Sequence, residues 1–354
     1  RLRRHKGRCR SSFSCAQTSA RSDTMFAVGC ALLAAAAAAQ DLRPCGRGGA
    51  ERCFRLEAPE AAGDVLLPAV ALGTWSGSYG ACAKADYACV RASALDAVET
   101  WVNDLNATHV DSANDYRTQV EVGRAIRNVD RSSLFLTTKC PGPTGFYATV
   151  QCAEDNLQML GLYGTGTNGY IDLLLVHFPF VIKPECMGVV DSDECAKSPY
   201  LDPGTAARQE TWRAMELLQK MGKVRAIGVS DYNATHLEET LAVATLPIAL
   251  HQVEWNPYTH DDAMLALCQQ RGIRLQAWSP LGGAKGSVLG EPTMVAVAKA
   301  HNVSTAQVAL KWAVQRGVAV VTGTDNRAHM QSDLDLWRFN LTIAEVDVIN
   351  NLKR

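Results

Sequence analysis

The sequence predicts an α/β fold, a (β/α)8 barrel of the TIM type with an N-terminal β-hairpin. Short apolar runs alternate with helix-period segments eight times, and no internal repeat or linker divides the chain after residue 52. The runs are continuously apolar, as in Ile171–Val176, which is typical of strands buried on both faces by helices. Eight alternations of strand and helix favour a closed barrel over an open doubly wound sheet.

The expected elements follow in chain order. The hairpin comes first, from Cys53–Leu56 and Val65–Leu67 around a loop containing Pro and Gly. Barrel strands are expected at Val70–Leu72, His109–Val110, Leu134–Thr138, Tyr170–Val176, Ala226–Val229, Ile248–Val253, Ile273–Trp278 and Val318–Val321. Helix-period patterns include Val90–Val102, Gln119–Val129, Thr149–Leu160, Ala206–Lys220, Ala234–Ala244, Asp261–Arg271, Thr305–Gln315 and Ala344–Leu352.

Charge and composition exclude several classes of partner. The 354 residues carry 35 Lys and Arg against 36 Asp and Glu, a net charge of −1. This balance provides no general attraction for nucleic acid or for acidic membranes. The hydrophobic fraction of 47% is ordinary for a globular protein. We expect a monomer that acts on a small molecule, with no nucleic-acid partner and no stable membrane span in the mature form.

The first 40 residues are expected to be a targeting segment, which leaves residues 41–354 as a single domain. Residues 1–24 are rich in Arg and Ser, and an apolar stretch then runs from Met25 to six alanines before Gln40. The stretch fits a secretory signal with small residues at the cleavage point. It is too short and too rich in alanine for a convincing bilayer span. A membrane-anchoring helix and a buried Ala-rich helix are the alternatives.

The cysteines favour an oxidising compartment. Nine of the twelve follow residue 40, and eight of these form near-neighbour couples. The couples are Cys45/Cys53, Cys82/Cys89, Cys140/Cys152 and Cys186/Cys195, with Cys268 left over. Zinc is disfavoured because the chain has no CxxC pair and no neighbouring His pair, so no metal is expected. The sequence does not prove the pairing.

Four glycosylation sequons are compatible with the same route. They begin at Asn106, Asn233, Asn302 and Asn340. We therefore expect a glycoprotein of the secretory pathway, extracellular or lumenal, with disulfide bonds. If the N-terminal segment is not a signal, the protein is cytoplasmic and the couples are unpaired thiols.

Polar residues gather where the predicted strands end, which is where (β/α)8 barrels carry their chemistry. The residues are Gly73, Thr74, Trp75, Asp111, Lys139, His177, Ser230, Asp231, Gln252 and Ser279, and Tyr116 follows Asp111 by five positions. Stability alone does not require a Lys, a His and an Asp together at these ends.

Seven segments resemble the aldo-keto reductases, in family order, over roughly residues 52–350. They are Leu72–Trp75, Asp111–Tyr116, Leu136–Lys139, Asp172–Pro179, Gly222–Ser230, His251–Pro257 and Trp278–Gly282. Any one of these segments alone is weak evidence for the resemblance, but all of them together in family order are strong evidence. The resemblance implies reduction of aldehydes or ketones to alcohols with a nicotinamide coenzyme, as in NADP+-dependent alcohol dehydrogenases or aldehyde reductases.

The resemblance makes Tyr116 the general acid, supported by Asp111, Lys139 and His177. A free tyrosine, with a pKa of about 10, is a poor acid near neutrality, and a nearby Lys139 ammonium would lower that pKa. Asp111 would hold Lys139 in place and charged, and a neutral His177 would donate a hydrogen bond to the substrate carbonyl. A Schiff-base aldolase would need an uncharged lysine, which Asp111 opposes.

The resemblance also implies the coenzyme contacts. Ser230, Asp231 and Gln252 are expected on the nicotinamide carboxamide, with Asp231 standing where the family more often has Asn. An ionised Asp accepts hydrogen bonds and cannot donate them. Trp278 is expected to stack on the nicotinamide. The remaining expected contacts are Gly73, Thr74, Trp75, Ser279, Leu281, Thr324 and His329.

The adenine end departs from the family pattern of Ile-Pro-Lys-Ser followed by an arginine. Gly323 stands in place of the lysine and His329 in place of the arginine, while Thr324 and Arg327 remain as phosphate contacts. Loss of an ammonium and of a guanidinium fork should weaken discrimination for NADPH. NADPH is the expected coenzyme, with NADH or dual use as the alternative.

The substrate pocket is expected to be open. Trp75 and Phe178 are the expected apolar walls, and Phe178 has a core position as its alternative. A Cys186–Cys195 bond would staple the loop after Phe178 over the mouth, and the C-terminal loop is almost absent. The alternative function is an NADP(H)-binding regulatory or interaction subunit with little turnover. None of the four catalytic residue types is missing.

Overall fold

The computed structural model describes residues 42–75, 82, 86–164, 169–183, 200–283 and 286–352. The expected targeting segment, residues 1–40, and the Cys186/Cys195 couple lie outside the described residues. Every barrel strand lies within them.

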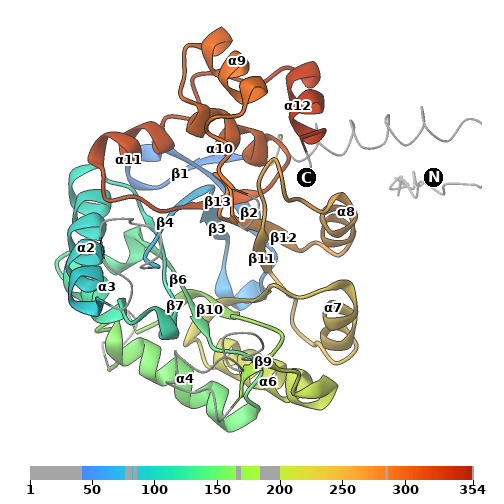
Figure 1. Ribbon diagram of the computed structural model, residues 1–354. Helices are drawn as coiled ribbons and strands as arrows, with labels where there is room; N and C mark the ends of the chain where they lie inside the picture. Colours follow the sequence, from blue (N-terminus) through green and yellow to red (C-terminus); the bar gives the residue numbers. More distant parts are fainter. Residues whose placement is uncertain are drawn as a thin grey trace, which may run out of the picture.

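Eight parallel strands close into a barrel at the centre of the molecule (Figure 1). Closure is completed by pairing of the last strand with the first, with Val320 opposite Val70. The strands are β4 (Val70–Gly73), β5 (His109–Asp111), β6 (Phe135–Cys140), β7 (Ile171–Val176), β10 (Val224–Ser230), β11 (Leu250–Glu254), β12 (Arg274–Trp278) and β13 (Ala319–Thr322). The (β/α)8 prediction and all eight predicted strands are confirmed.

Helices surround the barrel, as Figure 1 shows. They are α2 (Tyr87–Glu99), α3 (Gln119–Ile126), α4 (Phe146–Met159), α6 (Gly204–Lys220), α7 (Ala234–Leu241), α8 (Asp262–Gln270), α9 (Pro292–His301), α10 (Thr305–Gln315), α11 (Arg327–Leu334) and α12 (Ile343–Asn350). Asn233, Ser304 and Thr342 begin three of them with reciprocal capping boxes. Helices α9 and α11 were not predicted from the sequence; α11 buries only Met330 and Asp333 and so shows little apolar period.

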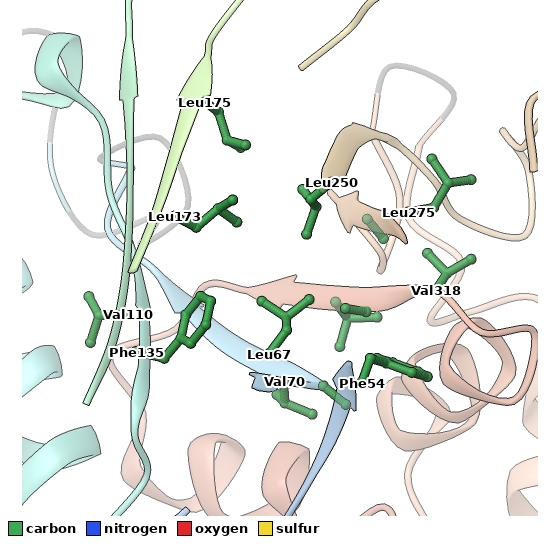
Figure 2. Close-up of a cluster of buried hydrophobic side chains, with 14 of the residues drawn as sticks. Phe54, Leu67, Val70, Val110, Phe135, Leu173, Leu175, Leu250, Leu275 and Val318 are labelled. Carbon is green, nitrogen blue, oxygen red and sulfur yellow. The ribbon is translucent and has the colours of Figure 1, made fainter. Parts of the chain in front are cut away.

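A three-stranded antiparallel sheet covers one end of the barrel. It consists of β1 (Arg43–Cys45), β2 (Glu51–Leu56) and β3 (Val65–Pro68), so the predicted hairpin is confirmed and gains a strand. Phe54 and Leu67 of this sheet are fully buried. Figure 2 shows them among Val70 and Phe135, the first residues of their strands. The sheet therefore fills the N-terminal end of the barrel and leaves the opposite end for the site.

One acidic residue lies inside the otherwise apolar strand β7, and its hydrogen-bond partners at the N-terminal end of the barrel explain why it is tolerated there. Asp172 in β7 has no exposed surface and accepts hydrogen bonds from the Arg131 and Arg225 guanidinium groups, at 2.5 and 2.9 Å, and from the Leu136 amide, at 2.9 Å. A buried carboxylate needs this compensation. Asp172 is thus structural and lies at the far end of its strand from His177.

Three of the predicted cysteine couples are disulfide bonds. They are Cys45–Cys53, Cys82–Cys89 and Cys140–Cys152. Cys268 is a buried thiol, as expected for the cysteine left over. Cys140 directly follows Lys139 and ties the end of β6 to α4.

We predict that a peptide map of the unreduced protein recovers these three pairs and finds Cys268 as an alkylated thiol. Replacing Cys140 and Cys152 together with Ser should lower the free energy of unfolding by about 2 kcal/mol, because the bond restricts the unfolded chain. Denaturant titration measures this loss. Recovery of all seven cysteines as thiols from protein made in an oxidising compartment would contradict the assignment.

Candidate active site

Four predicted catalytic side chains converge at the C-terminal ends of neighbouring strands. Asp111 ends β5, Lys139 lies in β6, and His177 directly follows β7. Tyr116 ends a short 3-10 turn, Asn114–Tyr116, just after β5. Because β5, β6 and β7 pair side by side in the barrel, residues far apart in sequence meet at one point.

The Lys139 ammonium is fully buried and finds an acceptor for each of its three hydrogens. It donates to Asp111 Oδ1 at 2.5 Å, to the Ser112 carbonyl at 3.0 Å and to Tyr116 Oη at 3.3 Å. Burial lowers the pKa of Lys139, but the Asp111 carboxylate and Tyr116, through their charge interactions and hydrogen bonds, together outweigh it and raise the pKa above its usual range. Lys139 therefore stays charged, which argues against a Schiff-base role.

Tyr116 is a weaker acid in this structure than was expected from the sequence. Burial raises the pKa of Tyr116 to about 12, while Lys139 lowers it and Asp111 opposes that effect. The expected contribution of Lys139 is present, but the expected net increase in acidity was wrong because desolvation outweighs one ammonium. The hydroxyl consequently holds its proton until a developing alkoxide takes it.

His177 lies between Tyr116 and a second acid. Its Nε2 is 3.5 Å from Tyr116 Oη, its Nδ1 is 2.9 Å from Asp115 Oδ1, and its ring stacks on Phe178. Burial lowers the pKa of His177. Asp115 was not predicted as a site residue, although an acid immediately before the tyrosine was a visible signal.

Gln252 turns into the barrel toward Asp111. Its amide nitrogen donates to Asp111 Oδ2 at 2.8 Å and to Gln276 Oε1 at 2.7 Å. Gln276 in β12 was missed, since a single polar residue inside an apolar run gives no functional signal. The expected carboxamide contact from Gln252 therefore competes with two protein acceptors.

Ser230, Asp231 and Trp278 lie together at the ends of β10 and β12. Ser230 is buried, and Asp231 has a left-handed backbone with φ of 55°. The Trp278 indole donates to Asp231 Oδ1 at 2.9 Å, which fixes the orientation of the ring. Burial raises the pKa of Asp231 to about 6. The predicted stacking ring and the predicted carboxamide partner thus contact each other.

Of the three residues at the end of β4 and directly after it, two are buried and one is exposed. Thr74 is fully buried, and its hydroxyl bonds to Ser112 and Thr118. A Cβ on Gly73 would lie 2.8 Å from Val321 Cγ1, so close packing excludes a side chain there. Trp75 is 54% exposed, as a residue at the mouth of a pocket would be.

The adenine-end residues lie before and at the start of α11. Thr324 accepts from the Asn326 amide at 3.1 Å, Asn326 caps the helix, and the His329 side chain is exposed. Ser279 and Leu281, after β12, are half-buried. Each of these residues therefore exposes part of its surface to solvent.

The described residues contain no group of three or more His, Cys, Asp and Glu side chains placed to hold a metal ion. None of their helices combines the length and the apolar character that a membrane crossing requires.

Comparison with known proteins decides the family. The sequence model of the Aldo/keto reductase family matches residues 69–354. The chain belongs to the aldo/keto reductase family. Two curated members are similar to it. The 9,11-endoperoxide prostaglandin H2 reductase of Trypanosoma cruzi is 30% identical over 82% of this chain and 90% of its own length. The glyoxal reductase of Bacillus subtilis is 33% identical over 69% and 78%.

A solved structure of the family has the same architecture. The Bombyx mori aldo-keto reductase, crystallised in complex with NADP, superposes with a TM-score of 0.68 at 29% identity. The match covers 84% of this chain and 92% of that one. Membership of this family of oxidoreductases, with its barrel, is therefore established for the chain.

We predict that Asp231→Asn stabilises this family member at neutral pH. A carboxyl whose folded-state pKa is raised contributes stability fully present below about pH 4, the unfolded pKa, and lost as pH rises through about 6. The amide removes that loss and still accepts from Trp278. Urea titrations should agree for both proteins near pH 4 and differ by on the order of 3 kcal/mol at pH 7. A constant difference across this range would contradict the assignment.

Proposed function

We propose that the chain is an NAD(P)H-dependent oxidoreductase that reduces aldehydes or ketones to alcohols, with Tyr116 as general acid. One observation carries the proposal: the Tyr116 hydroxyl lies 3.3 Å from a buried ammonium and 3.5 Å from an imidazole nitrogen. The glyoxal reductase activity named for the Bacillus relative supports a carbonyl substrate. NADPH is the proposed coenzyme, supported by the NADP complex of the Bombyx relative.

The residues at the barrel mouth fit a nicotinamide coenzyme. Trp278 offers a flat, half-buried face, and its hydrogen bond to Asp231 holds that face in place. Ser230 lies at the end of β10, two strands along the barrel from Trp278 in β12. We propose that these residues hold the nicotinamide, with Ser279 and Leu281 along the pyrophosphate and Thr324 and His329 at the adenine end. The bound coenzyme supplies the hydride.

The chain's own residues supply and control the proton. Tyr116 keeps its proton in the resting site because burial raises its pKa. When the substrate oxygen gains negative charge, that proton passes from Tyr116 Oη to the oxygen. The phenolate left behind faces the Lys139 ammonium, which stabilises it strongly in a buried site. Asp111 keeps the ammonium charged and fixed.

Aromatic side chains beside His177 suggest the substrate class. Phe178 stacks on His177, Phe180 stacks on Phe178, and Tyr200 packs on Phe180 with ring centroids 4.1 Å apart. We propose that these rings, together with the exposed Trp75, are the apolar walls of the substrate pocket. We therefore propose aldehydes with aromatic or extended apolar groups, in the manner of an NADP+-dependent alcohol dehydrogenase or aldehyde reductase.

The cysteines support the proposal of an oxidising location for the protein. We propose that residues 1–40 are a removed signal and that residues 41–354 are a single, monomeric, secreted or lumenal domain. The three disulfide bonds support this, since such bonds persist in oxidising compartments. The asparagines of all four sequons are exposed, as glycosylation requires.

Tyr116→Phe should lower kcat for an aromatic aldehyde by about 10²-fold or more, because the proton donor is removed while the ring remains. The decrease in NADPH absorbance at 340 nm measures the rate. Tyr163→Phe is the matched control, since Tyr163 is 60% exposed and outside the site. Coenzyme fluorescence should show unchanged NADPH binding. Equal rates for Tyr116→Phe and wild type would contradict the assignment of Tyr116 as general acid, and NADPH binding with negligible turnover by the wild type would support the regulatory-subunit alternative.

The adenine end should discriminate poorly between coenzymes. We predict that kcat/KM for NADPH exceeds that for NADH by less than about tenfold, because Gly323 and His329 provide no fixed cation. The combined Gly323→Lys and His329→Arg variant should raise that ratio about tenfold or more by restoring contacts to the 2′-phosphate. A strong NADPH preference in the wild type, unchanged by the pair, would show that other groups bind the phosphate.

A further inference from the structure

We propose that Asn156 in α4 is a positioning residue that holds the turn of Tyr116 against the backbone of Lys139 and so sets the distance between these two side chains. Asn156 has no exposed surface, so it acts through other residues. This inference rests on the proposed function, because it concerns the proton transfer from Tyr116.

The side-chain amide of Asn156 has a partner on each side. Its Oδ1 accepts from Asn114 Nδ2 at 2.9 Å and from Gln119 Nε2 at 2.7 Å. Its Nδ2 donates to the Lys139 carbonyl at 3.5 Å and lies 3.7 Å from both sulfurs of the Cys140–Cys152 bond. A carbonyl cannot donate, so the nitrogen faces Lys139 and the oxygen faces the two amides. The orientation of the side chain is therefore determined by its partners.

The partners of this amide lie next to the reacting groups. Asn114 begins the 3-10 turn that Tyr116 ends, and the accepting carbonyl is that of Lys139 itself. Gln119, the first residue of α3, adds a further link, because its Oε1 accepts from the Thr138 hydroxyl at 2.6 Å. One side chain from α4 thus joins the turn after β5 to the end of β6.

The turn that carries Tyr116 needs support from outside. It is three residues long, and 3-10 geometry gives poorer hydrogen bonds than an α-helix. Its own contribution is the bond from the Tyr116 amide to the Ala113 carbonyl at 3.2 Å. Arg117 follows with a left-handed backbone, φ of 62°, which is unfavourable for a residue with a Cβ atom. The bond from Asn114 to Asn156 connects this turn to a long helix.

The disulfide bond fixes the helix on which Asn156 lies. Cys152 precedes Asn156 by four positions, so the two side chains share one face of α4. The bond from Cys152 to Cys140 ties this face to the residue directly after Lys139. Asn156 therefore holds the turn from a fixed point beside β6.

The distance that these contacts set is the 3.3 Å between Tyr116 Oη and Lys139 Nζ. It lies at the long end for a hydrogen bond, so an increase of about 1 Å breaks the bond. The attraction between the ammonium and the phenolate formed in the reaction also falls with distance, most steeply in a buried site. Loss of the Asn156 contacts should therefore slow the proton transfer and leave coenzyme binding unchanged.

The first measurement is the rate of benzaldehyde reduction with NADPH. Asn156→Ser should lower kcat about tenfold, with an unchanged dissociation constant for NADPH. Asn114→Ala removes a single bond to the same amide and should lower kcat by a smaller factor. The double variant should lose no more than Asn156→Ser, because the two residues act through one contact. An unchanged kcat in Asn156→Ser, or losses that multiply in the double variant, overturns the proposal.

The solvent deuterium isotope effect on kcat separates positioning from loss of folded protein. A variant that only folds poorly contains less active enzyme and keeps the wild-type isotope effect. A displaced Tyr116 slows the proton transfer itself, so the isotope effect of Asn156→Ser should exceed that of wild type; an equal value overturns the proposal. Gln219→Ala is the matched control, because Gln219 is a buried amide that donates to the Arg225 carbonyl at 2.8 Å near the start of β10. Its isotope effect should be that of wild type.

Hydrogen–deuterium exchange of the full-length protein tests the contact without turnover. Peptides covering residues 112–122 should exchange faster in Asn156→Ser than in wild type, while peptides from α6 keep their wild-type rates. Unchanged exchange in residues 112–122 overturns the proposal even if aldehyde is reduced. Absence of aldehyde reduction by wild type contradicts the proposed function instead, and exchange still decides whether Asn156 holds the turn. Should Asn156→Ser fail to fold, Asn114→Ala serves for both the isotope effect and the exchange.

Discussion

The buried pair of Lys139 and Asp111 is the interaction on which the site depends. The two side chains are 0% and 2% exposed, and an uncompensated charge at either position would cost several kcal/mol. Each also has its remaining polar capacity filled: Lys139 by Ser112 and Tyr116, and Asp111 by Gln252. The arrangement places a permanent positive charge next to a phenol inside the protein, where its effect is far larger than in water.

The barrel makes this pair possible by separating the two ends of its strands. The N-terminal end is filled by the hairpin side chains Phe54 and Leu67, and its only buried acid in β7, Asp172, is balanced by Arg131 and Arg225. The hairpin does not cover the opposite, C-terminal end of the barrel, so polar side chains can lie there without hydrophobic side chains packed on them. The Cys140–Cys152 bond ties the end of β6 to α4 immediately beside Lys139, so the backbone that carries the ammonium is anchored to this helix.

Much of this could be predicted from sequence, for reasons that differ between residues. Strands such as Ile171–Val176 are apolar except for one acid, Asp172, so their existence could be predicted from the pattern of apolar residues. Lys139 and His177 could be found because polar residues at strand ends stand out. Gln276 could not, because its role depends on which neighbour it meets across the barrel. The pKa of Tyr116 could not either, since the sequence shows the nearby lysine but not the extent of burial.

The three site carboxylates show how the same group acts in different ways according to its donor. Asp111 meets a full positive charge, and its effect is electrostatic. Asp231 meets a neutral indole in a buried position, so its pKa is raised and its main effect is to set the plane of Trp278. Asp115 lies 2.9 Å from His177 Nδ1 near solvent, its pKa is lowered, and its main effect is to hold the imidazole ring in place. Since only Asp111 has a buried cation as partner, the other two can direct rings without adding a second fixed charge pair to the site.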